Sequence, residues 1–146
     1  MKTNLFLTFS VLLLSLTGCK KDDVSCSCQD PAPCDQMAVV DDDLFANGPD
    51  DEFFPQEVRI EGDCLYLRFQ YSGGCEEVDY QLLSGTTVAY SLPPQRTIRF
   101  SLDDDDPCEA LPVVEATFNL RPFRVAGQET VVLNFEGWGE SLTYIY

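Results

Sequence analysis

The stretch Cys64-Leu65-Tyr66-Leu67-Arg68-Phe69-Gln70-Tyr71 decides the fold of this chain. Aliphatic or aromatic side chains recur at every second position from Leu65 to Tyr71. The positions between them hold Arg68, Gln70 and a tyrosine. Successive side chains of a strand point to opposite faces of a sheet, so this period of two indicates a strand with one buried face.

The same alternation recurs on both sides of this stretch. Its apolar members are Val58/Ile60, Val78/Tyr80/Leu82, Val88/Tyr90/Leu92, Ile98/Phe100/Leu102, Val114/Ala116/Phe118/Leu120, Val131/Leu133/Phe135 and Leu142/Tyr144/Tyr146. Turn residues such as Ser84-Gly85 and Pro93-Pro94 separate these runs, and no helical period of 3.6 extends beyond two turns. The pattern predicts an all-β fold, an antiparallel β-sandwich of seven or eight strands that is immunoglobulin-like. A small barrel is the alternative.

Composition divides the chain into three parts. Residues 1–18 form an apolar leader, residues 19–56 an acidic tether and lead-in that contains cysteines and prolines, and residues 57–146 the predicted sandwich domain. Within the lead-in, Met37-Ala38-Val39-Val40 is a candidate for a short edge strand. The domain that remains after the leader is long enough to form one core.

The leader has the features of a secretory signal. Lys2 precedes an apolar run from Leu5 to Leu16. As a helix this run spans roughly 18 Å, too short for a permanent membrane anchor. The run ends in Leu16-Thr17-Gly18-Cys19, which resembles the lipobox of bacterial lipoproteins. The resemblance implies cleavage before Cys19 and lipidation of its thiol; an ordinary signal peptide is the alternative.

The residues after Cys19 suggest where the protein is displayed. Lys20-Lys21-Asp22-Asp23 is similar to the surface-export signal of Bacteroidota lipoproteins. The resemblance implies an outer-membrane lipoprotein exposed at the cell surface, with a periplasm-facing protein as the alternative. A solvated, charged tether without any export role is the simpler interpretation of the same four residues.

Charge and composition exclude several function classes. The chain has a formal charge of −16 and contains no histidine. Without residues 1–18, eight cations and 25 acids leave a charge of −17, which disfavours nucleic-acid binding. The lack of histidine excludes Ser-His-Asp and Cys-His catalysis as well as histidine-ligated zinc or haem.

Cysteine usage points to an oxidising compartment. One of the seven cysteines is the proposed lipidation site, and six remain: Cys26, Cys28, Cys34, Cys64, Cys75 and Cys108. An even number in an exported protein indicates disulfides, with up to three bridges and 15 pairings open. A zinc site formed by Cys26, Cys28, Cys34 and Cys64 is the alternative.

One segment carries a resemblance to a known group of proteins. Tyr71-Ser72-Gly73-Gly74-Cys75, followed by Tyr80, is similar to a strand-end motif of small Bacteroidota lipoproteins of unassigned function. The histidine of that motif is replaced here by Val78. The likeness covers roughly residues 57–146, and the NigD-like lipoproteins are more distant relatives. The resemblance implies a Cys75–Cys108 disulfide, and both cysteines follow predicted strands. Cys64 would then pair with one of the tether cysteines.

Four groups of residues are candidates for a binding or catalytic site. Asp103, Asp104, Asp105 and Asp106 offer the oxygen ligands that Ca²⁺ prefers, and Asp41-Asp42-Asp43 with Asn47 and Asp50-Asp51-Glu52 form a second acidic group. A solvated acidic loop is the alternative for both. Glu76, Glu77 and Glu109 flank the cysteines of the implied disulfide and could serve a carboxylate-based hydrolase. Trp138 with Phe53, Phe54 and the final tyrosines could form a stacking surface, or Trp138 could cover the sandwich end.

These observations favour a lipid-anchored, non-catalytic envelope or cell-surface protein that binds a partner or has a structural role. We expect no cofactor other than, in the second hypothesis, calcium in a glycan- or protein-binding module. A small hydrolase that uses carboxylates is the third hypothesis. The expected partners are the membrane, through the lipid, and an unidentified protein or glycan.

Overall fold

A computed structural model describes residues 34–146 as nine strands, one α-helix and one 3-10 turn. The strands are β1 (Gln36–Met37), β2 (Val39–Val40), β3 (Phe53–Glu61), β4 (Cys64–Tyr71), β5 (Asp79–Ser84), β6 (Gln95–Asp103), β7 (Val113–Asn119), β8 (Thr130–Phe135) and β9 (Ser141–Ile145). The helix α1 spans Asp42–Asn47, and the 3-10 turn spans Arg121–Phe123. The proposed lipidation site Cys19, the Lys20–Asp23 segment, Cys26 and Cys28 lie outside the described residues.

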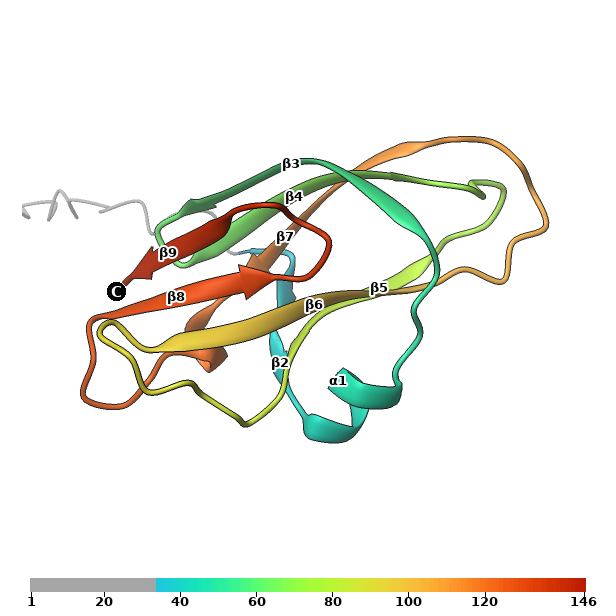
Figure 1. Ribbon diagram of the computed structural model, residues 1–146. Coiled ribbons are helices and arrows are strands. Elements are labelled where there is room, and N and C mark those ends of the chain that lie inside the picture. The colour runs from blue at the N-terminus through green and yellow to red at the C-terminus, as the bar shows by residue number, and fades with distance from the viewer. Residues whose placement is uncertain (1–33) are drawn as a thin grey trace, which may run out of the picture.

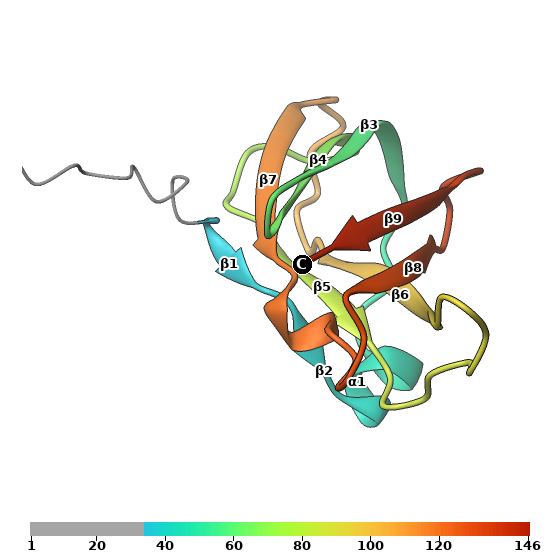
Figure 2. The same cartoon turned by 90° about the vertical axis from the view of Figure 1, so that its left-hand side faces the viewer.

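The strands form two sheets that pack face to face (Figures 1 and 2). One sheet has the order β1-β7-β4-β3 and the other the order β2-β5-β6-β8-β9. The predicted all-β sandwich is therefore confirmed. Its pairing is mixed rather than fully antiparallel, because β1 with β7, β2 with β5 and β6 with β8 are parallel. Alternation reveals which face of a strand is buried, whereas strand direction depends on how the connections cross between the sheets.

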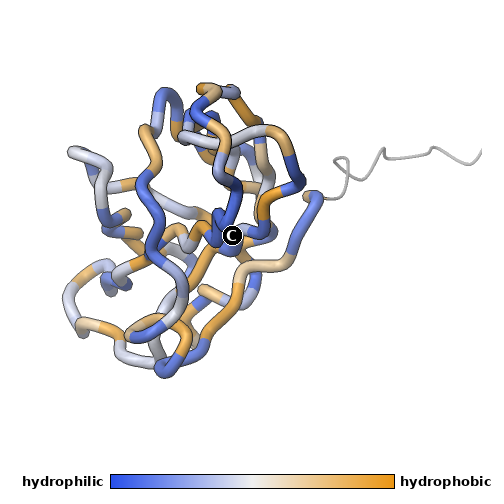
Figure 3. The backbone as a smooth tube through the Cα atoms, turned by 90° about the vertical axis from the view of Figure 1, so that its right-hand side faces the viewer, coloured by the Kyte–Doolittle hydropathy of each residue, from blue (hydrophilic) through white to orange (hydrophobic). Residues whose placement is uncertain are grey.

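Aromatic rings fill the space between the sheets. Phe100 of β6 packs against Phe69 of β4, with ring centroids 4.7 Å apart, and against Phe53 of β3 at 4.8 Å. Phe118 and Tyr80 complete the cluster. Hydrophobic and hydrophilic residues alternate along the chain in Figure 3, as the sequence period requires. Each of these rings contributes a large apolar area to the core, so burial of the cluster stabilises the packing of the two sheets.

The folded domain begins earlier than residue 57, where the sequence analysis placed its start. Residues 36–40 form a strand that changes sheets: β1 pairs with β7, and β2 pairs with β5. Ala38, at the crossing point, is buried. The edge strand predicted at Met37-Ala38-Val39-Val40 is present as the β1–β2 segment. The prolines and acids around it in the sequence had suggested a lead-in outside the domain.

Helix α1 was not predicted. The Asp41 carboxylate accepts hydrogen bonds from the Asp43 and Leu44 N–H groups, both at 2.9 Å, and so caps the first turn. At the other end, Arg99 of β6 donates to the Leu44 carbonyl at 2.8 Å. A run of aspartates before a short apolar pair is the sequence signal for such a helix start. No helix within residues 34–146 is long and apolar enough to cross a membrane.

The strand predicted at Val88–Leu92 is a loop. Tyr90 and Leu92 are 92% and 93% exposed, and only Ala89 forms a bridge, with Gln95. Pro93 and Pro94 follow at once and cannot donate the N–H groups that a ladder needs, so the alternation of Val88, Tyr90 and Leu92 has no sheet to join.

Two disulfides staple the sandwich. Cys75 is joined to Cys108, which connects the β4–β5 crossing to the β6–β7 crossing at one end of the molecule. Cys34 is joined to Cys64, which connects the start of the described chain to the first residue of β4. This pairing replaces the alternative zinc site, because a disulfide sulfur is not a thiolate ligand.

Removing the Cys75–Cys108 disulfide should lower stability. The bond closes a loop with a sequence separation of 33. We expect the double variant C75S/C108S to lose roughly 3–4 kcal/mol of unfolding free energy, measured by urea denaturation, because its unfolded chain gains entropy. The variant S72A, in the same crossing, is the control and should stay near the wild type. Equal stability of the double variant and the wild type would show that the crossings are held by other contacts.

Candidate functional site

The acidic loop Asp103–Asp106 lies beside the Cys75–Cys108 disulfide and is tied to it by hydrogen bonds. The Asp106 carboxylate accepts N–H groups from Cys75 at 2.5 Å, from Glu76 at 2.9 Å and from Cys108 at 2.9 Å. The Cys108 N–H contributes most to lowering the pKa of Asp106 below its usual value, against a smaller opposing effect of burial. Asp106 therefore orders the disulfide loops through their backbone.

The second predicted acidic group, residues 41–43 with 47 and 50–52, does not form one site. The Asp51 carboxylate accepts the Asp104 N–H at 2.8 Å, which brings part of the group to the first acidic loop. By contrast, Asp41 caps α1, and Asp42 accepts the Thr86 N–H at 2.7 Å and its hydroxyl at 2.6 Å. These last hydrogen bonds lower the pKa of Asp42. Most of these carboxylates thus satisfy backbone or side-chain donors of the fold itself.

Within residues 34–146, one group of potential metal ligands lies close together: Cys75, Asp106 and Cys108, with ligand atoms within 4.8 Å of one another. The two sulfurs form a disulfide and offer no thiolate. Asp106 is then the one remaining ligand of the group, and its carboxylate already accepts hydrogen bonds from three N–H groups. The arrangement fits a structural staple better than a metal centre. Calcium binding by Asp103, Asp104, Asp105 and Asp106 stays the alternative hypothesis.

The other sequence candidates do not assemble into a site. Glu76, Glu77 and Glu109 are exposed around the disulfide. Trp138 is half-buried and packs against the core, in line with the interpretation that it covers the sandwich end. Phe53 also packs into the core, with its ring against Phe100, so the aromatic residues are not gathered on one surface for stacking.

Sequence reasoning missed a cluster of charged and phenolic groups around Asp63, in the β3–β4 turn. The Asp63 carboxylate accepts hydrogen bonds from Arg121 Nε at 2.8 Å, Arg124 Nη2 at 2.5 Å and the Tyr144 hydroxyl at 2.6 Å. The guanidinium of Arg124 also stacks on the Tyr146 ring, 4.9 Å from its centroid. These residues come from three distant segments, and their spacing in the sequence carries no signal.

The cluster strongly perturbs two pKa values. Partial burial raises the pKa of Asp63, but the hydrogen bonds from Tyr144, Arg121 and Arg124 outweigh it and hold the pKa at about 2. Burial, and then the hydrogen bond to Asp63, raise the pKa of Tyr144 to about 12. Asp63 is therefore ionised and Tyr144 neutral at physiological pH. This arrangement holds the C-terminal strand in place, and the pKa values of Asp63 and Tyr144 both lie far from neutrality.

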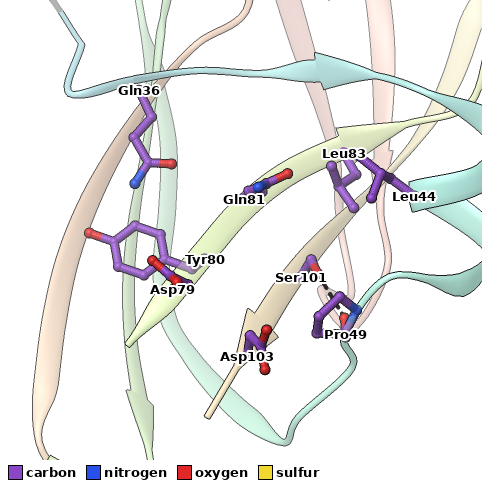
Figure 4. A pocket seen from close by; sticks show the side chains of 9 residues that line it. All are labelled: Gln36, Leu44, Pro49, Asp79, Tyr80, Gln81, Leu83, Ser101 and Asp103. Atoms are coloured by element: carbon purple, nitrogen blue, oxygen red, sulfur yellow. Dashed lines mark hydrogen bonds between the residues drawn. The ribbon is translucent and has the colours of Figure 1, made fainter. Parts of the chain in front are cut away.

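A polar groove of about 420 Å³ is the further candidate for a binding site (Figure 4). It lies beside β5 and β6, between β1 and the α1 segment. It is lined by Gln36, Leu44, Pro49, Asp79, Tyr80, Gln81, Leu83, Ser101 and Asp103. Ser101 donates a hydrogen bond to the Pro49 carbonyl at 2.7 Å and closes one side. The volume is within the range typical of ligand pockets.

Comparison with known proteins supports the fold alone. No protein-family model and no curated protein matches the chain. A solved protein of unknown function, DUF1344, from Bacteroides vulgatus ATCC 8482 is similar, with a TM-score of 0.52 and 12% identity over 76% of this chain and 55% of that one. A protein named as toxin-related, from Parabacteroides distasonis ATCC 8503, gives a TM-score of 0.52 and 18% identity over 76% and 58% of the two chains. The present chain thus spans little more than half of either.

Acid should weaken the fold through Asp63. Because its pKa is about 2 when folded and near 3.8 otherwise, its stabilising contribution is present above about pH 4 and is lost as the pH falls toward 2. That contribution is at most about 2.5 kcal/mol. We expect D63N to flatten the decline of unfolding free energy across this range, measured by urea denaturation at each pH. The variant E136Q, in an exposed turn, should keep the wild-type decline, and a D63N decline as steep as the wild type would contradict this assignment.

Calcium should have little effect on stability, because Asp51, Asp104 and Asp106 already accept backbone hydrogen bonds. We expect a thermal midpoint that is the same in millimolar Ca²⁺ and in chelator, measured by differential scanning fluorimetry. A rise of the midpoint with Ca²⁺ that disappears in D103N/D105N would establish the calcium-dependent alternative instead.

Proposed function

We propose that this chain is a lipid-anchored, extracytoplasmic β-sandwich that acts without catalysis, as a binding or structural module of the cell envelope. The lipidated residue is Cys19, and the domain is displayed at the cell surface. Acyl chains on one cysteine provide stable anchoring because each buried CH₂ contributes about 0.8 kcal/mol.

The observation that carries the proposal is the pair of disulfides, in a chain whose first 18 residues have the sequence pattern of a secretory signal. Cys34–Cys64 and Cys75–Cys108 join segments 30 and 33 residues apart. Such bonds persist in oxidising compartments outside the cytoplasm. The leader, the Leu-Thr-Gly-Cys sequence and the disulfides are separate features, and each of them supports a location outside the cytoplasm.

A non-catalytic role is supported by what the strongest polar clusters do. Asp106 orders two loops, and Asp63 is held by two arginines and a tyrosine. Both carboxylates have lowered pKa values, which suits permanent ion pairs and hydrogen bonds. A carboxylate that acts as a general base or acid needs a raised pKa, close to the pH at which the enzyme works. The resemblance to Bacteroidota lipoproteins adds no activity to this proposal.

Metabolic labelling tests the anchor. Cells of a Bacteroidota host that produce the chain are grown with a clickable palmitate analogue, and the chain is recovered by immunoprecipitation. We expect the wild type to carry the label and to partition into the detergent phase, and C19A to lose both properties. The variant C26A removes a nearby cysteine and should keep the label. An unlabelled wild type, or a labelled C19A, would refute lipidation at this cysteine.

Protease treatment of intact cells extends the same experiment to localisation. A domain at the surface is digested while a periplasmic marker survives. A domain that is digested only after the outer membrane is broken faces the periplasm, which would overturn the surface assignment and leave the lipid anchor intact.

A further inference from the structure

Strand β5 has an open edge inside the polar groove. Its neighbour β2 pairs with it only at Leu83 and Ser84. The residues that precede Ala38 belong to β1, which pairs with β7 of the other sheet. Among the described residues, Asp79–Gln81 have no strand partner on that side. An unpaired strand edge presents a row of hydrogen-bonding groups that another extended chain can join.

The hydrogen-bonding groups at this edge can be assigned by alternation. The Ser84 carbonyl accepts the Asp41 N–H at 2.9 Å, so the backbone of Ser84 faces the β2 side. In a strand, residues two apart direct their backbone groups to the same side, and therefore Leu82 and Tyr80 face it too. Tyr80 lines the groove, and Gln36 of β1 reaches toward it (Figure 4). The Tyr80 N–H and C=O are thus the groups available to a new strand.

The charges around the groove favour a positively charged partner. Asp79 and Asp103 are direct cross-strand partners, and both line the groove at its outer end. Asp35 lies close enough for its negative charge to add to the effect of burial in raising the pKa of Tyr80. No lining residue is cationic. Arg99, behind Leu44 and Pro49, is engaged by their carbonyl oxygens and by Asp50. The electrostatic complement of this surface is a positively charged ligand.

The other sheet edges are less suited to strand addition. Strand β3 contains Pro55 and a register shift next to it, and its outer face carries the Arg59 ion pairs with Glu57 and Glu61. Strand β9 is also an edge strand, but none of its residues lines the groove. Strand β7 is also open before Phe118, but none of its residues lines the groove. The open edge, the groove and the unpaired acids coincide only at β5 among the described strands.

We propose that the β5 edge binds an extended, cationic peptide segment of another protein by strand addition. The peptide backbone pairs with Tyr80, and its lysine or arginine side chains meet Asp79 and Asp103. This inference deepens the proposed binding role by naming its site and its class of partner, and it does not depend on lipidation at Cys19.

Fluorescence polarisation tests it with a labelled peptide of alternating lysine and valine, seven residues long. The protein is the full chain, purified in mild detergent. We expect saturable binding that D79N/D103N weakens by about three- to tenfold, the effect of removing two exposed charge pairs. The matched control E136Q/E140Q removes the same charge from the β8–β9 turn and should bind within about twofold of the wild type.

Two further probes separate strand addition from simple charge attraction. A peptide of the same sequence with N-methyl groups on alternate residues keeps its charge but cannot form the ladder, and we expect it not to bind. A glutamate-valine peptide should not bind either. Hydrogen exchange of the Tyr80 amide should slow when the lysine-valine peptide is bound.

Several results would overturn the proposal. They are equal binding of the N-methylated peptide, equal binding by D79N/D103N and the wild type, or no binding of the lysine-valine peptide at all. None of these bears on the labelling of Cys19, so failure at the groove and failure of the anchor are distinguished. The N-methylated probe uses the unaltered protein and stays decisive should a substitution disturb folding.

Discussion

The contact between Phe100 and the rings of the opposite sheet is the constraint on which the rest of the structure depends. Phe100 belongs to β6, and its ring lies against Phe53, Phe69 and Phe118, one from each of three strands of the facing sheet. Burying these rings sets which face of β3, β4, β6 and β7 points inward. The outward positions are then free for other purposes: Arg99 and Ser101 hold the α1 segment, and Asp103 borders the groove.

The fold was largely predictable, because alternation over most strands is a local property of the sequence. Strand direction and partners were not, since β6 and β8 become parallel neighbours only after the chain crosses to the other sheet and back. The Val88–Leu92 run shows the limit of periodicity, because the two prolines that follow prevent pairing. The disulfide between Cys75 and Cys108 was implied by a resemblance, whereas the choice of Cys34 as partner of Cys64 needed the structure.

The candidate sites were harder to foresee for the same reason. Asp63 meets Arg121 and Tyr144 only because β4, the 3-10 turn and β9 converge. The groove exists because β1 and β2 belong to different sheets. No sequence motif indicates this change of sheet. The acidic runs were visible in the sequence, but the hydrogen bonds that they form in the fold could not be predicted from it. Asp41 caps a helix, and Asp106 orders two loops. A run of carboxylates in the sequence does not reveal which of them accept hydrogen bonds from the backbone of the fold.

The Cys34–Cys64 bond has a mechanical consequence. Tension applied through the N-terminal segment enters the domain at Cys34 and passes at once into Cys64, the first residue of β4. Strand β4 is paired along its length with both β3 and β7. A pull on the N-terminal segment therefore acts on an interior strand that is held on both sides, and the two-residue pairings of β1 and β2 do not carry that load.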